Sequence, residues 1–183
     1  MVGTVELSPE TQGRPSLGVG VSKRLFLVFH LRGTVCALPV SAIREVVALP
    51  LLSRPPGLPS LLEGFLNLGG SAIPVLRLDR LFGLPDLVPG LYTPLLVLRQ
   101  PEDRIALLVE AVRGIVTVQS ADVRSVPGGD SFNDCVEGEL TFGDDVVHLL
   151  SAERLLLEKE RQCLAELQAV EQERLRSLEE VRS

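Results

Sequence analysis

The sequence is poor in the residues that build most ligand pockets and active sites. Among 183 residues it has no tryptophan, one tyrosine (Tyr92), one methionine and two histidines. Aromatic side chains line many small-molecule pockets, and histidine is the commonest general acid or base. His30 and His148 both lie in apolar runs, and no nucleophile elbow, phosphate loop or dinucleotide-binding glycine pattern occurs. The sequence therefore predicts a protein that is not an enzyme.

The few cysteines also argue against a fold held together by disulfide bonds or by a metal ion. Cys36, Cys135 and Cys163 are widely spaced and odd in number, which fits neither a disulfide framework nor a metal-ligand pattern. Asp144-Asp145 has no ligand-spaced partner, so we interpret it as a turn. We expect reduced thiols, a cytoplasmic protein, and no metal or other cofactor.

Positive charge and long apolar runs are scarce as well. The chain has 18 Lys and Arg against 24 Asp and Glu, a net charge of −6, and no basic stripe. This balance argues against nucleic acid and against an anionic membrane surface as partners. No apolar run approaches the roughly 20 residues that span a bilayer, so we expect no membrane insertion. Residues 1–23 do not read as a signal peptide, and their composition predicts a flexible tail.

Short apolar runs separated by turn residues are what the sequence has in abundance. Runs of this kind predict β-strands joined mainly as hairpins. They cover residues 24–31, 35–40, 42–49, 64–68, 71–78, 95–99, 104–109, 111–118, 136–142 and 145–150. Gly69-Gly70 lies between two of these runs, where a two-residue primed turn requires positive φ. A helical turn is expected near residue 80, stopped by Gly83 and Pro85.

The chain matches itself in two places. CALPVSAIREVV (36–47) aligns with IALLVEAVRGIV (105–116), and GFLNLGGSAIPVLRLDRLF (64–82) aligns with GELTFGDDVVHLLSAERLL (138–156). Two matches in the same order favour an internal duplication. We expect two similar β units, each running hairpin, strand, long loop, hairpin and helical turn.

This order of strands resembles the CheW family over roughly residues 24–157. The resemblance is carried by Ala37-Leu38-Pro39, Glu45-Val46, Asn67-Leu68 and Ile73-Pro74-Val75. It implies a mainly β fold of two tandem SH3-like five-stranded β-barrels, followed by a long C-terminal helix. It also implies a non-catalytic adaptor that couples a chemoreceptor or other sensor to a CheA-type histidine kinase. An alternative from a different class is a small β-barrel module that binds an apolar ligand or lipid between its halves.

The resemblance also implies partner-binding positions. Ile43, Pro94, Leu95 and Ile115 would lie along a receptor groove between the barrels, although core packing explains apolar residues equally well. Glu45 and Val46 would lie near the groove or on the kinase-facing side. The family's Asn-Leu-Arg-Gly motif is here Asn67-Leu68-Gly69-Gly70, so Gly69 replaces the arginine that contacts receptors. Arg77 also stands where the family usually has aspartate. The expected receptor contact is therefore atypical.

From Ser151 the apolar spacing changes to that of a helix. Ser151 is a good N-cap, Glu153 suits a first turn, and no Gly or Pro follows. We therefore expect a helix from Ser151 nearly to the end, with residues 158–183 as its continuation. Its apolar stripe must pack on something: the chain's own barrels, a second copy or a partner. The expected helix interface is Leu164, Leu167, Val170, Leu175, Leu178 and Val181.

Overall fold

A computed structural model describes residues 22–99, 104–127 and 134–182. The tail predicted over residues 1–23 lies outside these ranges, except for Ser22 and Lys23. The described ranges contain strands, two short helices of the 3-10 type, one helical turn and one long helix. Their bounds are β1 (Lys23–Leu31), β2 (Thr34–Pro39), η1 (Val40–Ala42), β3 (Ile43–Ala48), β4 (Leu62–Leu68), β5 (Ser71–Arg77), α1 (Leu78–Leu81), β6 (Pro94–Leu98), β7 (Ala106–Leu108), β8 (Ala111–Gln119), η2 (Ser120–Asp122), β9 (Val136–Phe142), β10 (Asp145–Leu150) and α2 (Glu158–Arg182).

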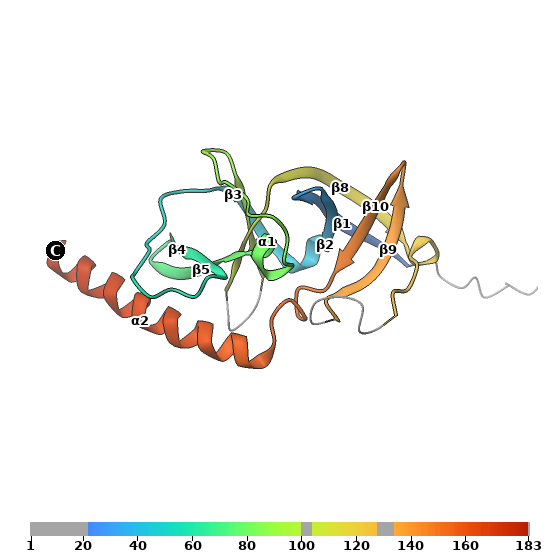
Figure 1. Cartoon of the computed structure of the whole chain (residues 1–183). Helices are drawn as coiled ribbons and strands as arrows, with labels where there is room; N and C mark the ends of the chain where they lie inside the picture. The colour runs from blue at the N-terminus through green and yellow to red at the C-terminus, as the bar shows by residue number, and fades with distance from the viewer. Residues whose placement is uncertain (1–21, 100–103, 128–133, 183) are drawn as a thin grey trace, which may run out of the picture.

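The strands form two five-stranded sheets, each curled into a small barrel (Figure 1). Barrel 1 has the strand order β8-β1-β2-β10-β9, and barrel 2 has the order β3-β6-β7-β5-β4. Each barrel has one parallel pair, β2 with β10 and β5 with β7. The predicted architecture, a mainly β protein with two five-stranded barrels and a C-terminal helix, is confirmed.

The two barrels repeat each other down to their irregularities. The β1–β8 ladder skips Arg113 and the β3–β6 ladder skips Arg44, and these arginines are aligned in the internal repeat. The β9–β10 ladder skips Glu137 and the β4–β5 ladder skips Glu63, which are also aligned. A β-bulge changes the direction of a strand, so equal bulges at aligned positions give both barrels the same shape. This correspondence supports the predicted duplication.

The repeats do not each fold into a barrel of their own. Barrel 1 takes its hairpin β1–β2 from the first repeat and β8, β9 and β10 from the second. Barrel 2 takes β3, β4 and β5 from the first repeat and its hairpin β6–β7 from the second. The first hairpins have in effect been exchanged, so neither barrel is complete without strands from both halves of the chain.

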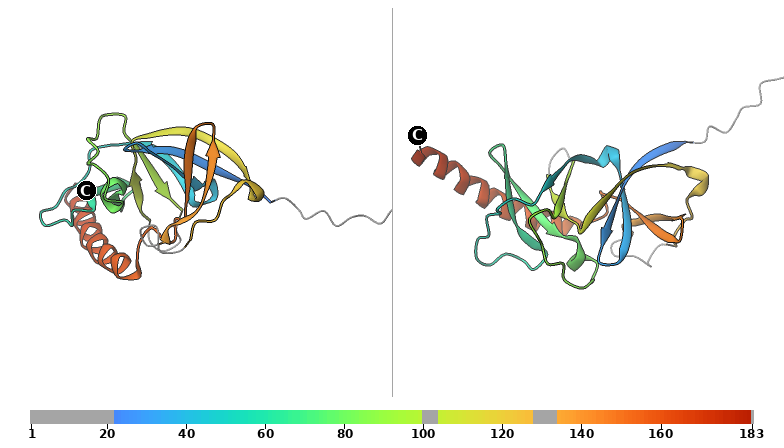
Figure 2. Two further views of the ribbon diagram at one scale, coloured as in Figure 1. Left: turned by 45° about the vertical axis from the view of Figure 1, so that its right-hand side comes forward. Right: turned by 90° about the horizontal axis from the view of Figure 1, so that it is seen from above.

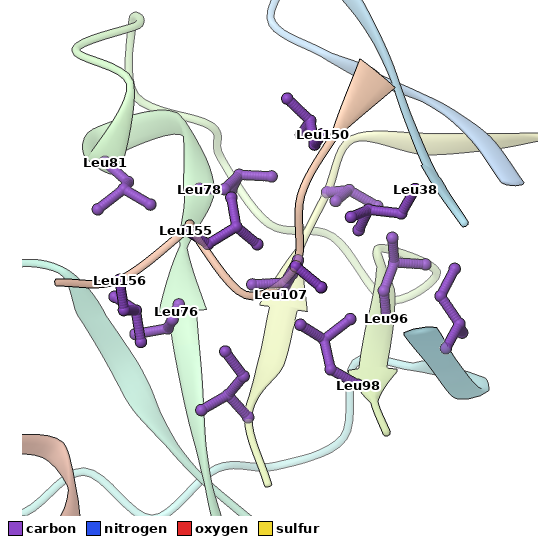
Figure 3. Packing of buried hydrophobic residues seen from close by; sticks show 14 of the residues in the cluster. Leu38, Leu76, Leu78, Leu81, Leu96, Leu98, Leu107, Leu150, Leu155 and Leu156 are labelled. Carbon is purple, nitrogen blue, oxygen red and sulfur yellow. The ribbon is translucent and has the colours of Figure 1, made fainter. Parts of the chain in front are cut away.

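The core has three clusters, and the largest lies in the seam between the barrels. Figure 3 shows the leucines that meet there, among them Leu38, Leu96, Leu98 and Leu107. Two smaller clusters fill the interiors of barrel 2 and barrel 1. Because the seam is filled by packed side chains, it joins the barrels into one unit.

Three of the glycines have clear structural reasons. At the tip of the β4–β5 hairpin, Gly69 and Gly70 have φ of +59° and +81°, which confirms the predicted primed turn. Gly64 has φ of +153°, and a Cβ on it would lie 2.6 Å from the backbone oxygen of Ser53. Ser53 pairs there with Phe65 through two backbone hydrogen bonds of 2.8 and 2.9 Å. Gly64 thus lets the loop before β4 close onto the strand.

The long helix begins later than predicted. Residues 151–157 are turns, and α2 starts at Glu158, so the expectation of an N-cap at Ser151 is wrong. The buried Ser151 donates its backbone N–H to the carbonyl oxygen of Cys135 instead. Leu155 and Leu156 are buried in the seam, which holds this segment out of helical register with α2. The helix is capped at Leu157, whose N–H donates to the Glu160 carboxylate at 2.8 Å, as in a capping box.

Helix α2 packs on the chain's own barrel 2, along the β4–β5 hairpin (Figures 1 and 2). Strand β7 pairs only with residues 75–77 of β5, and glutamine side chains take its place farther along β5. Gln172 Oε1 accepts from the Ala72 N–H at 2.9 Å, and Gln168 Nε2 donates to the Ala72 carbonyl oxygen at 2.8 Å. Gln172 Nε2 also donates to the Gly70 carbonyl oxygen at 2.8 Å.

The predicted helix stripe divides between two environments. Leu164 is buried in the seam cluster, and Leu167 and Leu175 are half-buried against it. The other three members of the stripe are exposed: Val170, Leu178 and Val181. The first alternative, a helix that folds back over its own barrels, therefore accounts for half of the stripe.

Candidate functional site

Barrel 1 has an apolar cavity between its two edge strands, β8 and β9. Its volume is about 180 Å³. The lining comes from four strands of barrel 1 and the end of β9: Val28, Val35, Arg113, Gly114, Ile115, Val116, Leu140, Phe142, Asp145 and Val147. We call this cavity the barrel 1 mouth. Two large apolar side chains at the mouth are exposed, Ile115 at 58% and Phe142 at 63%.

The corresponding part of barrel 2 contains an additional buried leucine. Leu140 and Val147 align with Leu66 and Ile73 in the repeat, and Val28 corresponds to Val97 because each pairs with an aligned alanine, Ala37 or Ala106. Val97, Leu66 and Ile73 all belong to the barrel 2 interior. That interior is completed by Leu87, from the loop after α1. The interior cluster of barrel 1 is built from its strands, with Val123 packed beside it, and α2 leaves for barrel 2. At this position barrel 2 thus has a loop leucine in its buried cluster, whereas the buried members of the barrel 1 cluster come from its strands.

A buried charge network holds Leu87 in the interior of barrel 2. Arg77 donates to both carboxylate oxygens of Asp79, at 2.9 and 2.6 Å, to Glu63 at 2.9 Å, and to the Leu87 carbonyl oxygen at 2.7 Å. Asp79 in turn accepts from the Leu87 N–H at 2.7 Å. Both backbone groups of Leu87 are thus bound by this pair. Arg77, which departs from the usual family residue, has a structural role as the centre of the network.

The network also determines the ionisation of its members. Burial by itself would raise the pKa of Asp79, but hydrogen bonds from Arg77 and Leu87 hold it below the usual value. The hydrogen bond to Asp79 raises the pKa of Arg77 despite its burial. Both groups are therefore charged at neutral pH. A charge pair with this many hydrogen bonds orders the loop and leaves little for chemistry.

The thiols show no sign of activation. Burial raises the pKa of Cys36 to about 12 and that of Cys135 to about 11. A reactive cysteine needs the opposite shift, toward the thiolate at neutral pH. These two residues therefore serve as small apolar core residues.

Two of the positions predicted by resemblance are buried. Ile43 is buried in the seam and Leu95 is fully buried in barrel 2, so both are core residues. Pro94 is half-buried and pairs with Ala48, and its carbonyl oxygen accepts from Val109.

The remaining predicted positions lie at the surface. Glu45 is half-buried and forms an ion pair with Arg44 at 3.3 Å. Its neighbour Val46 is 45% exposed on β3, and Ile115, the repeat partner of Val46, is exposed on β8 of the other barrel. The structure thus places these surface residues on both barrels.

The turn that carries Gly69 lies at the surface and is held by Asn67 as well as by Gln172 of α2. The Gly70 N–H donates to the Asn67 side-chain oxygen at 3.0 Å. A Cβ on Gly69 would meet no other atom within 4 Å. The position therefore has room for a side chain, although its positive φ disfavours one.

Sequence reasoning missed most residues of the barrel 1 mouth. Val35, Leu140, Phe142 and Val147 alternate along predicted strands as ordinary core positions do. One signal could have located them: the first repeat is followed by the apolar LPDLVPGLY, whereas the second is followed by a helix. The segment that places Leu87 in the interior of barrel 2 thus has no counterpart after the second repeat.

Comparisons with known proteins agree with this architecture. The family model described as "CheW-like domain" matches residues 25–160. The chain is 23% identical over 103 residues to the chemotaxis protein CheW of Bacillus subtilis, covering 56% of this chain and 66% of that protein. It therefore spans just under two thirds of that relative. It is 22% identical over 141 residues to the chemotaxis protein CheW of Rhizobium meliloti, covering 76% and 91%.

A solved structure shares the fold. The scaffolding protein CheW from Thermoanaerobacter tengcongensis superposes with a TM-score of 0.69 at 21% identity, covering 76% of this chain and 97% of that chain. Within the residues that the structure describes, neither helix is long and apolar enough to cross a membrane.

Proposed function

Because this chain belongs to the CheW-like domain family, we propose that it is a non-catalytic adaptor in a chemotaxis-type signalling system. It couples a chemoreceptor or another sensor to a CheA-type histidine kinase in the cytoplasm. The family match, the names of the relatives and the double-barrel fold support this proposal.

The open mouth of barrel 1 is the observation that supports a contact with the kinase. Its exposed Ile115 and Phe142 border an apolar cavity of about 180 Å³. Apolar anchors beside a pocket are typical of protein–protein hot spots. Arg113 and Asp145 also line the mouth and supply charges of both signs for a polar rim. In barrel 2 the equivalent residues Val97 and Ile73 are buried in one cluster with Leu87.

The contact with the sensor is the atypical part of the proposal. An arginine fork gives several charge-assisted hydrogen bonds, and Gly69 gives none. The sensor is therefore one whose recognition does not depend on that arginine, with Asn67 and the neighbouring turn at the surface.

A matched pair of variants tests the kinase contact. Ile115→Asp places a charge at the barrel 1 mouth, and Val46→Asp makes the same change at the repeat-equivalent position of barrel 2. Both side chains are about half exposed, so both variants should fold. We expect Ile115→Asp to weaken binding to the kinase regulatory domain by about 10-fold or more, as measured by calorimetry, and Val46→Asp to have little effect. The reverse pattern would place the kinase on barrel 2.

Self-association through α2 remains a separate proposal. It is supported by the exposed Val170, Leu178 and Val181, which a monomer would leave in water. Sedimentation velocity should then show a dimer that Val170→Ser and Leu178→Ser together convert to monomer. A wild-type chain that stays monomeric at about 100 μM, well above typical dissociation constants of stable dimers, would refute it.

A further inference from the structure

A second cavity lies where α2 crosses barrel 2, away from the barrel 1 mouth. Its volume is about 270 Å³. The apolar part of its lining comes from the loop before β4, from β4 and from α2: Leu52, Phe65, Leu66 and Leu175. Leu51, which also lines it, is 96% exposed. We call this space the α2–β4 cavity.

The cavity contains a buried carboxylate. Glu171 lines it and is only 3% exposed. The Ser53 hydroxyl donates to Glu171 Oε1, and Arg174 lies 3.7 Å from Oε2 with a side chain that is 58% exposed. A carboxylate has about four acceptor positions, so this pairing leaves capacity for another donor. Among the described residues that line the cavity, Glu171 is the only charged one.

Docking of the helix does not account for this glutamate. Gln168 and Gln172, on the same face of α2, bond the open edge of β5 directly. Glu171 makes a hydrogen bond to a loop hydroxyl and lies against leucines and a phenylalanine. Burial of a carboxylate is costly unless a cation or donor offsets it. An ion pair of 3.7 Å with a largely exposed arginine offsets it only in part.

The lining of the α2–β4 cavity indicates what kind of group could bind there. An aliphatic stem would pack on Leu52, Leu66 and Leu175, while a cation at its end would reach Glu171. Lysine and arginine side chains combine these two parts. The volume is just below the roughly 300–1,000 Å³ of small-molecule sites, which favours one side chain over a separate ligand. Leu51 and Asn67, exposed beside the opening, offer contacts to the backbone that carries it.

We propose that the α2–β4 cavity receives a lysine or arginine side chain from a partner protein, with Glu171 as its counter-ion. The site shares no residue with the barrel 1 mouth. A failure of the proposed kinase contact would therefore not refute this proposal, and the reverse also holds. It makes α2 part of a binding surface as well as a cover for β5.

The test uses the full chain and simple probes in NMR titrations. The probes are N-acetyl-lysine methylamide, N-acetyl-arginine methylamide, the uncharged N-acetyl-norleucine methylamide, and n-butylammonium. We expect the two basic amino acids to shift the amide signals of Ser53, Asn67 and Glu171, with affinities about 10-fold or more above that of norleucine. We expect n-butylammonium to bind more weakly, because it lacks the backbone part.

Glu171→Gln and Glu173→Gln form the variant pair. Both remove one negative charge from α2, but Glu173 is exposed. Glu171→Gln keeps an oxygen that can accept from Ser53, and unchanged signals elsewhere would show that it folds. We expect Glu171→Gln to lose about 10-fold or more in affinity for the basic probes and Glu173→Gln to bind as wild type does.

Several results would overturn the proposal. One is equal binding of the lysine and norleucine probes, and another is full binding by Glu171→Gln. A third is that the probes shift only amide signals of residues that lie away from the cavity. Binding of n-butylammonium as tight as that of the blocked amino acids would indicate a small-amine site instead of a protein contact, and would also refute it.

Discussion

Leu164→Ala measures how firmly α2 belongs to the folded unit. Leu164 is 8% exposed in the seam cluster, beside Pro74, Ile105 and Leu156. Truncation of a buried leucine to alanine costs about 2–5 kcal/mol, depending on how far the site relaxes. Leu164 belongs to α2 and packs on the seam, and this single helix can shift toward the barrel when the side chain is shortened. We therefore expect a loss near the lower end, about 2–3 kcal/mol.

The assay is urea and thermal unfolding, followed by circular dichroism at 222 nm, which reports mainly α2. A loss of this size should lower Tm by about 5–10 °C in a chain of this length. Val170→Ala is the control, because Val170 is 71% exposed on the same helix. Alanine is the better helix former, so this variant should be neutral or slightly stabilised.

The two variants separate the possible positions of the helix. If Leu164→Ala stays within about 0.5 kcal/mol of wild type, α2 does not contribute to the core as described. If Val170→Ala is as costly as Leu164→Ala, the exposed face is buried in an oligomer. That outcome would also make Tm rise with protein concentration.

Three further predictions concern the charge network and the glycines. Asp79→Asn should lower the stability by about 3 kcal/mol, because it leaves Arg77 buried without its main counter-ion. The pKa of Asp79 is depressed in the folded state, so its contribution is present above about pH 4, the unfolded value, and is lost as the pH falls further. An unfolding series from pH 6 to 2 should show a shallower acid loss for Asp79→Asn, and parallel curves would refute this assignment. Gly64→Ala should lower Tm much more than Gly33→Ala, because only the former brings a Cβ within 2.6 Å of a backbone oxygen; equal Tm values would contradict that contact. Gly69→Arg should fold with a cost of about 1–2 kcal/mol from its positive φ and should strengthen binding to a standard receptor tip; unchanged affinity in the folded variant would show that the missing arginine does not set receptor choice.

The sequence was sufficient to predict the elements but not their partners. The alternation of apolar residues and the turn residues located the hairpins, and the repeat predicted two equivalent barrels. It could not predict that hairpin β1–β2 joins β8 and β10. Aligned strands of the two repeats present similar apolar faces. Hairpin β1–β2 could therefore pair equally well with strands of its own repeat or with their equivalents in the other repeat. The long connections between them decide the exchange, and their course is a property of the whole fold.

The errors at the C-terminal segment have a similar cause. Ser151 carries the local signals of an N-cap, but burial of Leu155 and Leu156 in the seam outweighs the roughly 1 kcal/mol that a cap contributes. The sequence also could not distinguish exposed from buried residues among the expected binding positions. Leu95 and Ile115 are both apolar residues in strands, and only the assembled barrels show that Leu95 is fully buried while Ile115 is exposed.

The two extensions of the repeats explain why equivalent barrels have different surfaces. The segment after the first repeat returns to barrel 2 and inserts Leu87 into its interior. The segment after the second repeat also goes to barrel 2, where α2 completes the edge of β5. Barrel 1 receives neither, and its mouth keeps exposed apolar residues that a packed domain would normally bury. A duplicated fold has thus become asymmetric without any change in its strand order. Changes at Leu87 and its charge network should therefore affect mainly stability, and changes at the barrel 1 mouth should affect mainly binding.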